Sequence, residues 1–443
     1  MKTDLLIKHC SILTSDFEIK HGQNIVIQDQ KIIAIEEDNT TQIYQAKEIL
    51  NGKGKLVMPG LIDAHTHTNQ HLLRGRISDE YPMIWTRIMV PFESNLREDD
   101  VAISAELSCL EMLKAGTTGF IDAGGSYMHK VAEAVASSGL RGALSCSTMD
   151  TGDAIPASMK TTMEENIQRS KNLFDTYHGK ADGRIHVWYS LRSLITCTPE
   201  LIQKVYEMAK ADGTGMQTHM NEYPNEISYC LENFQMRPYE LLESLGVLDE
   251  NFLGAHSILL SEHEMELIQQ YNSKVVHCPI SNAGKGFTKS PGLMQKGVGI
   301  GLGTDGAAHS GLSLFDQMKV FKSLMRAFWG VPIFDPVVMP SKNILDMATL
   351  GGAKAMLQDE QFGTIEVGKK ADMILIDMYQ PHIAPTHQLT NTLIESANSK
   401  DVADVIVNGQ ILMKNREVLT LDEERIKYES KKAMDDLIVR AKI

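Results

Sequence analysis

The feature that most constrains the fold of this chain is a series of short apolar runs that each end in a polar group. The first run begins at Met58 and ends in His65-Thr-His67. Side chains two residues apart in a β-strand point the same way, so both imidazoles can face one point. Later apolar runs end at His219, His256, His277 and Asp305. Polar strand ends that recur in chain order indicate one site built from distant segments.

Between these endings the chain alternates apolar strands with amphipathic helices. Buried parallel strands are typically continuous apolar runs, and we expect them at 61–65, 117–122, 140–146, 184–191, 215–219, 252–256, 274–278 and 298–304. Asp99, Thr198 and Ser261 supply helix-start signals between the strands. The pattern predicts an α/β chain with a (β/α)8 TIM-type barrel, whose site lies at the carboxyl ends of the strands. A doubly wound sheet is the alternative, but no Gly-x-Gly-x-x-Gly follows the first strand.

Both ends of the chain show a different pattern. Short strands are expected at 4–8, 24–28 and 31–35, and again at 363–366, 371–377 and 402–409, before a charged helix over 421–441. Neither end has enough strands to bury a core alone, so we expect both to form one small β-sandwich domain. The predicted division assigns 1–57 and 361–443, with the terminal helix, to this domain and 58–360 to the barrel.

Composition excludes several classes of function. The 443-residue chain can bury a large core, and its formal net charge of −14 argues against a nucleic-acid partner, which requires clustered Lys and Arg. The sequence has no apolar stretch long enough to span a membrane, and its first residues lack a secretory core. Six scattered cysteines without C-x-x-C fit a reducing compartment. We expect a cytoplasmic protein that acts on small molecules.

Three motifs carry a resemblance to a known family: Pro59-Gly-Leu-Ile-Asp-Ala-His-Thr-His67, Leu72-Leu-Arg-Gly75 and Gly363-Thr-Ile-Glu-Val-Gly-Lys-Lys-Ala-Asp372. With them the chain resembles, over nearly its whole length, the amidohydrolase superfamily, and within it the metal-dependent deaminase and chlorohydrolase branch. That branch includes S-adenosylhomocysteine deaminases, guanine deaminases and triazine hydrolases. The resemblance implies a metal-dependent barrel enzyme and, by analogy, a homo-oligomer.

The resemblance also implies roles for individual residues. The implied metal ligands are His65, His67, His219 and Asp305. Glu222 would carry protons, His256 would contact the metal-bound water, and Asp305 would serve as both ligand and base. Three imidazoles and a carboxylate suit Zn²⁺, with Fe²⁺ or Mn²⁺ as alternatives. Binuclear relatives bridge two ions with a fourth-strand lysine, and 187–193 contains none; we expect one ion per subunit.

This ligand set predicts hydrolytic chemistry. A bound cation lowers the pKa of its water to about 7. Attack on an amidine-like ring carbon would then release ammonia, provided that Glu222 protonates the ring nitrogen and the leaving amine. We predict a deaminase of a small aminated N-heterocycle such as a purine, pyrimidine, pterin or triazine. The alternatives are a chlorohydrolase or cyclic amide or amidine hydrolase and, outside enzymes, an inactive barrel scaffold.

Loops that follow the strands are expected to form the substrate pocket. The candidate substrate contacts are Trp85, Glu93, Arg192, His277, Asn282 and His309. Trp85, in the loop after the first strand, would either cover a planar ring or simply pack. Glu93 resembles the acid that S-adenosylhomocysteine deaminases use on ribose hydroxyls, or else is an exposed acid. His277 and Asn282 could equally shape a loop.

Arg192 and His309 depart from the family pattern. Purine-deaminating relatives have Pro-His-x-Pro-Tyr where this chain has Leu191-Arg-Ser-Leu, and they often have Ser in place of His309. A guanidinium favours an oxo or anionic group. We therefore expect Arg192 to contact such a group and adenosine-type substrates to be disfavoured. The alternative is a structural Arg192 paired with an acidic loop.

Overall fold

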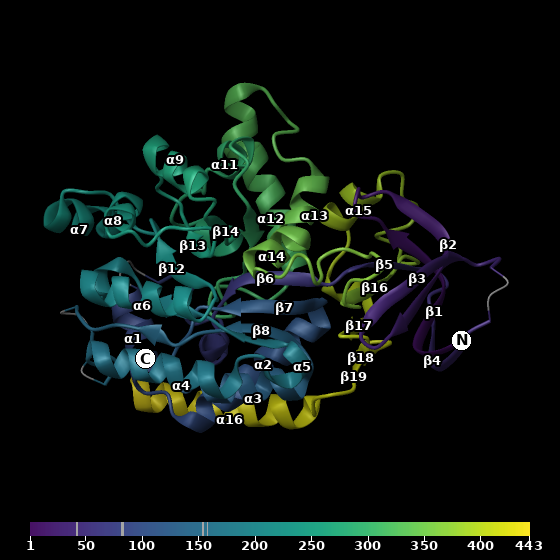
Figure 1. Ribbon diagram of the computed structural model, residues 1–443, viewed down its shortest axis with the longest axis horizontal. Coiled ribbons are helices and arrows are strands. Elements are labelled where there is room, and N and C mark those ends of the chain that lie inside the picture. Colours follow the sequence, from purple (N-terminus) through teal and green to yellow (C-terminus); the bar gives the residue numbers. More distant parts are fainter. Residues whose placement is uncertain (41–42, 81–83, 153–154, 157) are drawn as a thin grey trace.

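The computed structural model describes residues 1–40, 43–80, 84–152, 155–156 and 158–443. A parallel barrel surrounded by helices lies beside a second sheet built from both chain ends (Figure 1). The barrel strands are β6 (Leu61–Thr66), β7 (Thr117–Asp122), β8 (Arg141–Leu144) followed by β9 (Ser147–Thr148), β10 (Ile185–Val187) followed by β11 (Tyr189–Leu191), β12 (Met216–Met220), β13 (Phe252–His256), β14 (Lys274–His277) and β15 (Ile300–Leu302). Each predicted barrel strand is present, which confirms the (β/α)8 prediction.

Register brings the polar strand ends to one rim of the barrel. The strands pair in parallel, so that His219 lies opposite Ala255 and His277 opposite Leu302. The last strand closes on the first where the amides of Thr304 and Asp305 donate to the carbonyl of His65, at 3.1 and 3.0 Å. This closure requires glycine, because a Cβ on Gly303 would lie 2.8 Å from the same carbonyl oxygen.

Helices cover the outside of the barrel and begin where the sequence predicted. The side chain of Thr198 caps one helix and Ser261 caps another through a capping box with Glu264. The principal helices are α2 (Glu98–Ala115), α3 (Met128–Ser138), α4 (Met163–Tyr177), α6 (Pro199–Ala211), α7 (Pro224–Phe234), α8 (Pro238–Ser244), α9 (Glu262–Gln270), α12 (Leu314–Met325), α13 (Ser341–Ala348) and α16 (Glu423–Ala441). Shorter helices are α1 (Val90–Ser94), α5 (Lys180–Gly183), α10 (Pro279–Asn282), α11 (Ser290–Gln295), α14 (Leu350–Ala355) and α15 (Leu389–Glu395).

The second sheet unites both ends of the chain. Its strands follow the order β19 (Glu417–Val418), β18 (Gln410–Lys414), β17 (Val402–Val407), β16 (Met373–Asp377), β5 (Lys55–Pro59), β1 (Lys2–Leu13), β2 (Ile19–Gln28) and β3 (Lys31–Glu37), with β4 (Gln45–Asn51) paired to β1. The sheet bends back on itself, since Ile32 donates to the carbonyl of Lys369 at 2.9 Å and Ala371 to that of Gln30 at 2.9 Å. Side chains from both ends, such as Ile7 and Leu375, therefore share one apolar core.

Two details of the flanking regions differ from the sequence predictions. The stretch 363–366 is not a strand, because Gly363 turns the backbone with a φ of 98°. The C-terminal helix α16 was assigned to the β domain in the predicted division. It lies along α2 on the barrel (Figure 1), where Arg440 and Arg425 pair with Asp100 and Glu106 at 2.5 and 2.8 Å. Among the described residues, no helix combines the length and apolar character that crossing a bilayer requires.

Candidate metal and active site

Four predicted ligands converge at the carboxyl rim of the barrel. The ligand atoms of His65, His67, His219 and Asp305 all lie within 4.8 Å of one another. Nε2 of His67 is 3.1 Å from Nε2 of His219, and Oδ1 of Asp305 is 3.3 Å from Nε2 of His65. Two ligands on a tetrahedral zinc ion, each bonded at about 2.0–2.1 Å, stand roughly 3.3 Å apart. The spacing therefore fits one small divalent ion.

Unpartnered ring nitrogens support the same fit. Both ring nitrogens of His65 and Nδ1 of His67 are buried without a hydrogen-bond partner, an arrangement that is unfavourable unless a ligand completes it. Nδ1 of His219 lies 2.8 Å from the carbonyl oxygen of Arg192 and can donate to it, which leaves Nε2 for the cluster. Burial, followed by neighbouring positive charge, holds the pKa of His67 and His219 well below its ordinary value. Both shifts favour the neutral ring, which is the form that binds a metal ion.

Two buried aspartates that the sequence interpretation did not single out fix the strand ends. Asp63 accepts from the amide and hydroxyl of Thr304 at 3.0 and 2.6 Å. Asp122 accepts from the amide and hydroxyl of Thr68 at 3.2 and 2.5 Å. Burial raises the pKa of Asp63 to about 7 against these hydrogen bonds. Asp305, which follows Thr304, has a φ of 60°, an uncommon conformation for a residue other than glycine. Local hydrogen bonds thus hold Asp305 in the turn that directs it to the cluster.

Glu222 and His256 lie next to this cluster, and the ring centre of His256 is 5.1 Å from that of His65 and 5.5 Å from that of His219. Nε2 of His256 is 3.8 Å from Oε1 of Glu222 and 3.9 Å from Oδ1 of Asp305. Asn282, predicted as a substrate contact, instead places its Oδ1 2.9 Å from Nδ1 of His256 and orients that ring. Nε2 of His309 lies 3.2 Å from Oδ2 of Asp305, so His309 does belong to the cluster.

Glu93 and Arg192 pair with each other in the structure. The Arg192 guanidinium donates to both oxygens of Glu93 at 3.1 and 3.0 Å, and both side chains are buried. Gln70 also donates to Glu93 at 2.7 Å. Trp85 lies in the helical turn η2 (Trp85–Met89) rather than in a loop, with its ring centre 5.9 Å from the guanidinium carbon of Arg192. The structure therefore contains the pairing with an acid that was the alternative interpretation of Arg192.

His277 and Lys285 depart most from expectation. Nδ1 of His277 lies 2.9 Å from Oγ of Ser290 and its ring contacts Phe321, while burial lowers its pKa to about 3. These contacts fix the orientation of the ring, while its buried Nε2 has no hydrogen-bond partner among the described residues. Lys285 was not predicted, yet its Nζ lies 2.5 Å from Oε1 of Glu222. A lysine in a glycine-containing loop is usually solvated, so the sequence offered no signal for it.

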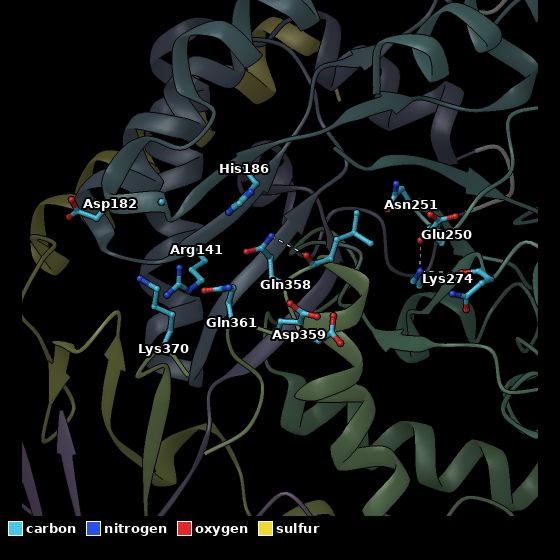
Figure 2. A pocket seen from close by; sticks show the side chains of 14 residues that line it. Arg141, Asp182, His186, Glu250, Asn251, Lys274, Gln358, Asp359, Gln361 and Lys370 are labelled. Carbon is cyan, nitrogen blue, oxygen red and sulfur yellow. Dashed lines mark hydrogen bonds between the residues drawn. The ribbon is translucent and has the colours of Figure 1, made fainter. Parts of the chain in front are cut away.

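A separate pocket of about 600 Å³ lies at the opposite end of the barrel, near the strand starts (Figure 2). Arg141, Lys274 and Lys370 line it with several acids. Arg141 is held by Asp372 and Asn408, and Lys370 donates to Gln30 at 2.6 Å. These cations are already paired, and barrel enzymes bind substrate at the other rim. The pocket is therefore a structural junction between barrel and sheet.

Comparison with known proteins agrees with this geometry. The sequence matches the Amidohydrolase family over residues 56–412. It is 36% identical to a 5′-deoxyadenosine deaminase of Methanosarcina acetivorans, with 99% of each chain covered. It is 34% identical to a 5-methylthioadenosine/S-adenosylhomocysteine deaminase of Thermoanaerobacter pseudethanolicus, covering 99% of this chain and 100% of that one. A crystal structure of an adenosine deaminase from Xanthomonas campestris with bound zinc has a TM-score of 0.92 at 25% identity, with 99% of both chains covered.

The fold, the converging ligands and the length of these matches agree, and the inactive-scaffold alternative loses its support. The chain belongs to the amidohydrolase family and is a metal-dependent deaminase within it.

Proposed function

We propose that this deaminase acts on adenine nucleosides whose 5′ carbon lacks a free hydroxyl, such as 5′-deoxyadenosine and 5′-thioether nucleosides. The names of relatives 36% and 34% identical over 99% of the chain support this substrate class. They weigh against the prediction from Arg192 and His309 that adenosine-type substrates are disfavoured. The observation that carries the reaction type is the four-ligand cluster with Glu222 beside it.

In this proposal, one divalent ion, with Zn²⁺ as the native metal, is held by His65, His67, His219 and Asp305. When bound, the ion supplies activation of a water molecule near neutral pH. Asp305 would accept a proton from the attacking water, and Glu222 would carry protons to the purine ring nitrogen and then to the leaving amine. His256, oriented by Asn282, would present Nε2 to the oxygen that attacks the ring carbon. A homo-oligomer remains the expected assembly.

The buried Glu93–Arg192 pair gives the proposed pocket its polar wall. Glu93 would accept hydrogen bonds from the ribose hydroxyls, while Arg192 and Gln70 hold its carboxylate in one orientation. We expect Arg192→Ala to raise KM at least tenfold, because an unheld carboxylate loses this orientation. Metal content should stay at one ion, because only the backbone carbonyl of Arg192 contacts a ligand. An unchanged KM would remove Arg192 from substrate binding.

The proposed function is tested by ammonia release from metal-loaded protein. The substrates are 5′-deoxyadenosine, methylthioadenosine and S-adenosylhomocysteine, compared with adenosine, guanine, a pterin and a chlorotriazine. We expect the 5′-modified nucleosides to give the highest kcat/KM. Glu222→Gln should lower kcat by about 10²–10⁴-fold, the usual contribution of a positioned acid–base group, with unchanged metal content. Activity confined to guanine or pterins would overturn the proposed substrate class. Chloride release without ammonia would overturn the proposed deamination reaction.

A further inference from the structure

Lys285 is a buried cation among the catalytic carboxylates. Its Nζ lies 2.5 Å from Oε1 of Glu222 and 3.6 Å from Oδ2 of Asp305, and its side chain is 10% exposed. It also donates to Oγ of Ser281 at 2.8 Å, and that hydroxyl donates to Asp305 at 2.5 Å. A buried ammonium is strongly unfavourable unless it is paired. Glu222 and Asp305 are therefore its counter-ions.

The chain holds this ammonium in a defined place. Lys285 follows the short helix α10, and its amide donates to the carbonyl of Asn282 at 2.8 Å. The next residue, Gly286, has a φ of 145°, and a Cβ there would lie 2.7 Å from Cγ2 of Ile258. The ring centre of Tyr223 lies 5.3 Å from Nζ. Turn geometry and a neighbouring aromatic ring thus direct the side chain into the site.

The residues around Lys285 also form a second set of potential metal ligands. Ligand atoms of Glu222, His256 and Asp305 lie within 4.8 Å of one another. Nε2 of the fully buried His256 has no hydrogen-bond partner, and Asn282 orients the ring. An oriented imidazole beside two carboxylates is a donor set for a divalent ion. The Lys285 ammonium nevertheless already lies against both carboxylates.

We propose that the Lys285 ammonium is the second cation of this centre, where it blocks the Glu222–His256–Asp305 group and limits each chain to one divalent ion. The inference rests on the metal site of the proposed function and deepens it. One divalent ion and Lys285 bring three positive charges against the two carboxylates. A unit positive charge about 4 Å away weakens binding of a further monovalent cation by roughly 1,000-fold, and of a divalent ion by more. Removing that charge should therefore open the second group to metal.

The test is a zinc titration of metal-free protein, followed by calorimetry and by elemental analysis after dialysis. We expect wild type to bind one Zn²⁺ per chain, and Lys285→Met to bind a second, with an affinity at least 100-fold above any second binding to wild type. Lys285→Arg, which keeps the charge, should bind one. Lys289→Met is the matched control. Lys289 is in the same loop, its side chain is 31% exposed, and its Nζ lies 3.4 Å from a carboxylate oxygen of Glu262.

A double variant locates the second ion. Adding Glu222→Gln to Lys285→Met removes a ligand of the second group and should return the stoichiometry to one. The proposal is overturned if folded Lys285→Met binds one ion as wild type does. It is also overturned if wild type, with Lys285 intact, takes up two ions at similar affinity, a result that needs no variant to fold. Wild type that binds no ion would instead overturn the proposed metal site.

Discussion

At the residue scale, the buried carboxylates of this protein fall into three groups. Glu222 and Asp305 face the Lys285 ammonium; burial alone would raise the pKa of Glu222, but the neighbouring His256 and Lys285 lower it. Asp63 is held by hydrogen bonds. Glu226, four residues after Glu222 and in the first turn of α7, is 4% exposed, and neither of its oxygens has a hydrogen-bond partner. Ionisation of this last carboxyl is therefore unfavourable.

Glu226 should make stability depend on pH. Burial and then the charge of Glu222 raise the pKa of Glu226 from 4.5 to about 8 in the folded protein. The unfolded chain loses this proton above pH 4.5, whereas the folded chain keeps it until about pH 8, so wild-type stability falls across that window. Glu226→Gln has no proton to lose. Its stability relative to wild type should rise by on the order of 2–4 kcal/mol between pH 4.5 and pH 8.

Urea unfolding at pH 5 and pH 8.5 measures this difference. Glu232→Gln is the control, because Glu232 lies exposed on the same helix α7. Its effect on the unfolding free energy should be the same at both pH values. An equal effect of Glu226→Gln at both pH values would show that Glu226 is ionised in the folded state.

At the element scale, helix α9 links a capping box to the catalytic loop. Ser261 caps the helix, its Oγ accepting from the amide of Glu264 at 3.1 Å. The fully buried Glu264 also accepts from Arg237 at 2.8 Å and from Asn221 at 2.9 Å. Asn221 precedes Glu222 in the chain and has a φ of 49°. The Glu264 carboxylate thus connects α9 to the start of α8 and to Asn221, the residue before the proposed proton carrier Glu222.

Variants of Ser261 and Glu264 should separate the effect of helix capping from the effect on catalysis. Ser261→Ala should lower the unfolding free energy by about 1 kcal/mol, as loss of an N-cap does, with kcat unchanged. Glu264→Ala removes the buried carboxylate that pairs with Arg237 and holds Asn221, and should cost about 3–5 kcal/mol and lower kcat. Thermal unfolding and steady-state rates on the same preparations measure both effects. A fall in kcat for Ser261→Ala would mean that helix capping itself positions Glu222.

The same scale explains what could be predicted from the sequence. The barrel strands were predictable because each is a continuous apolar run that ends in a polar residue. The convergence of His65 and His219 followed from the parallel register of those strands. The partner of Arg192 could not be predicted, because Glu93 lies 99 residues away in the chain. Lys285 resembled an ordinary surface lysine in sequence. Only the fold brings it to Glu222.

At the scale of the whole molecule, a buried ion pair helps to join the barrel to the flanking sheet. Arg141 begins β8, and its guanidinium donates to Asp372 at 3.0 Å and to Asn408 at 2.5 Å. Asp372 immediately precedes strand β16 of the sheet and also accepts from the amide of Asn408 at 2.7 Å. Strand β5 of the sheet runs directly into strand β6 of the barrel, so the chain itself connects the two parts at that point. The ion pair fastens them at a second point.

Arg141→Met should therefore weaken the whole fold rather than one part of it. Removing one partner of a buried pair leaves Asp372 uncompensated, and we expect a loss of about 3–5 kcal/mol. Arg425→Met is the matched control, because it removes a 41% exposed arginine paired with Glu106 and should cost at most about 1 kcal/mol. Urea unfolding followed by circular dichroism and by loss of bound zinc distinguishes the outcomes. Coincident transitions shifted together mean that barrel and sheet unfold as one unit, whereas zinc loss that stays at the wild-type midpoint would show that the pair stabilises the sheet alone.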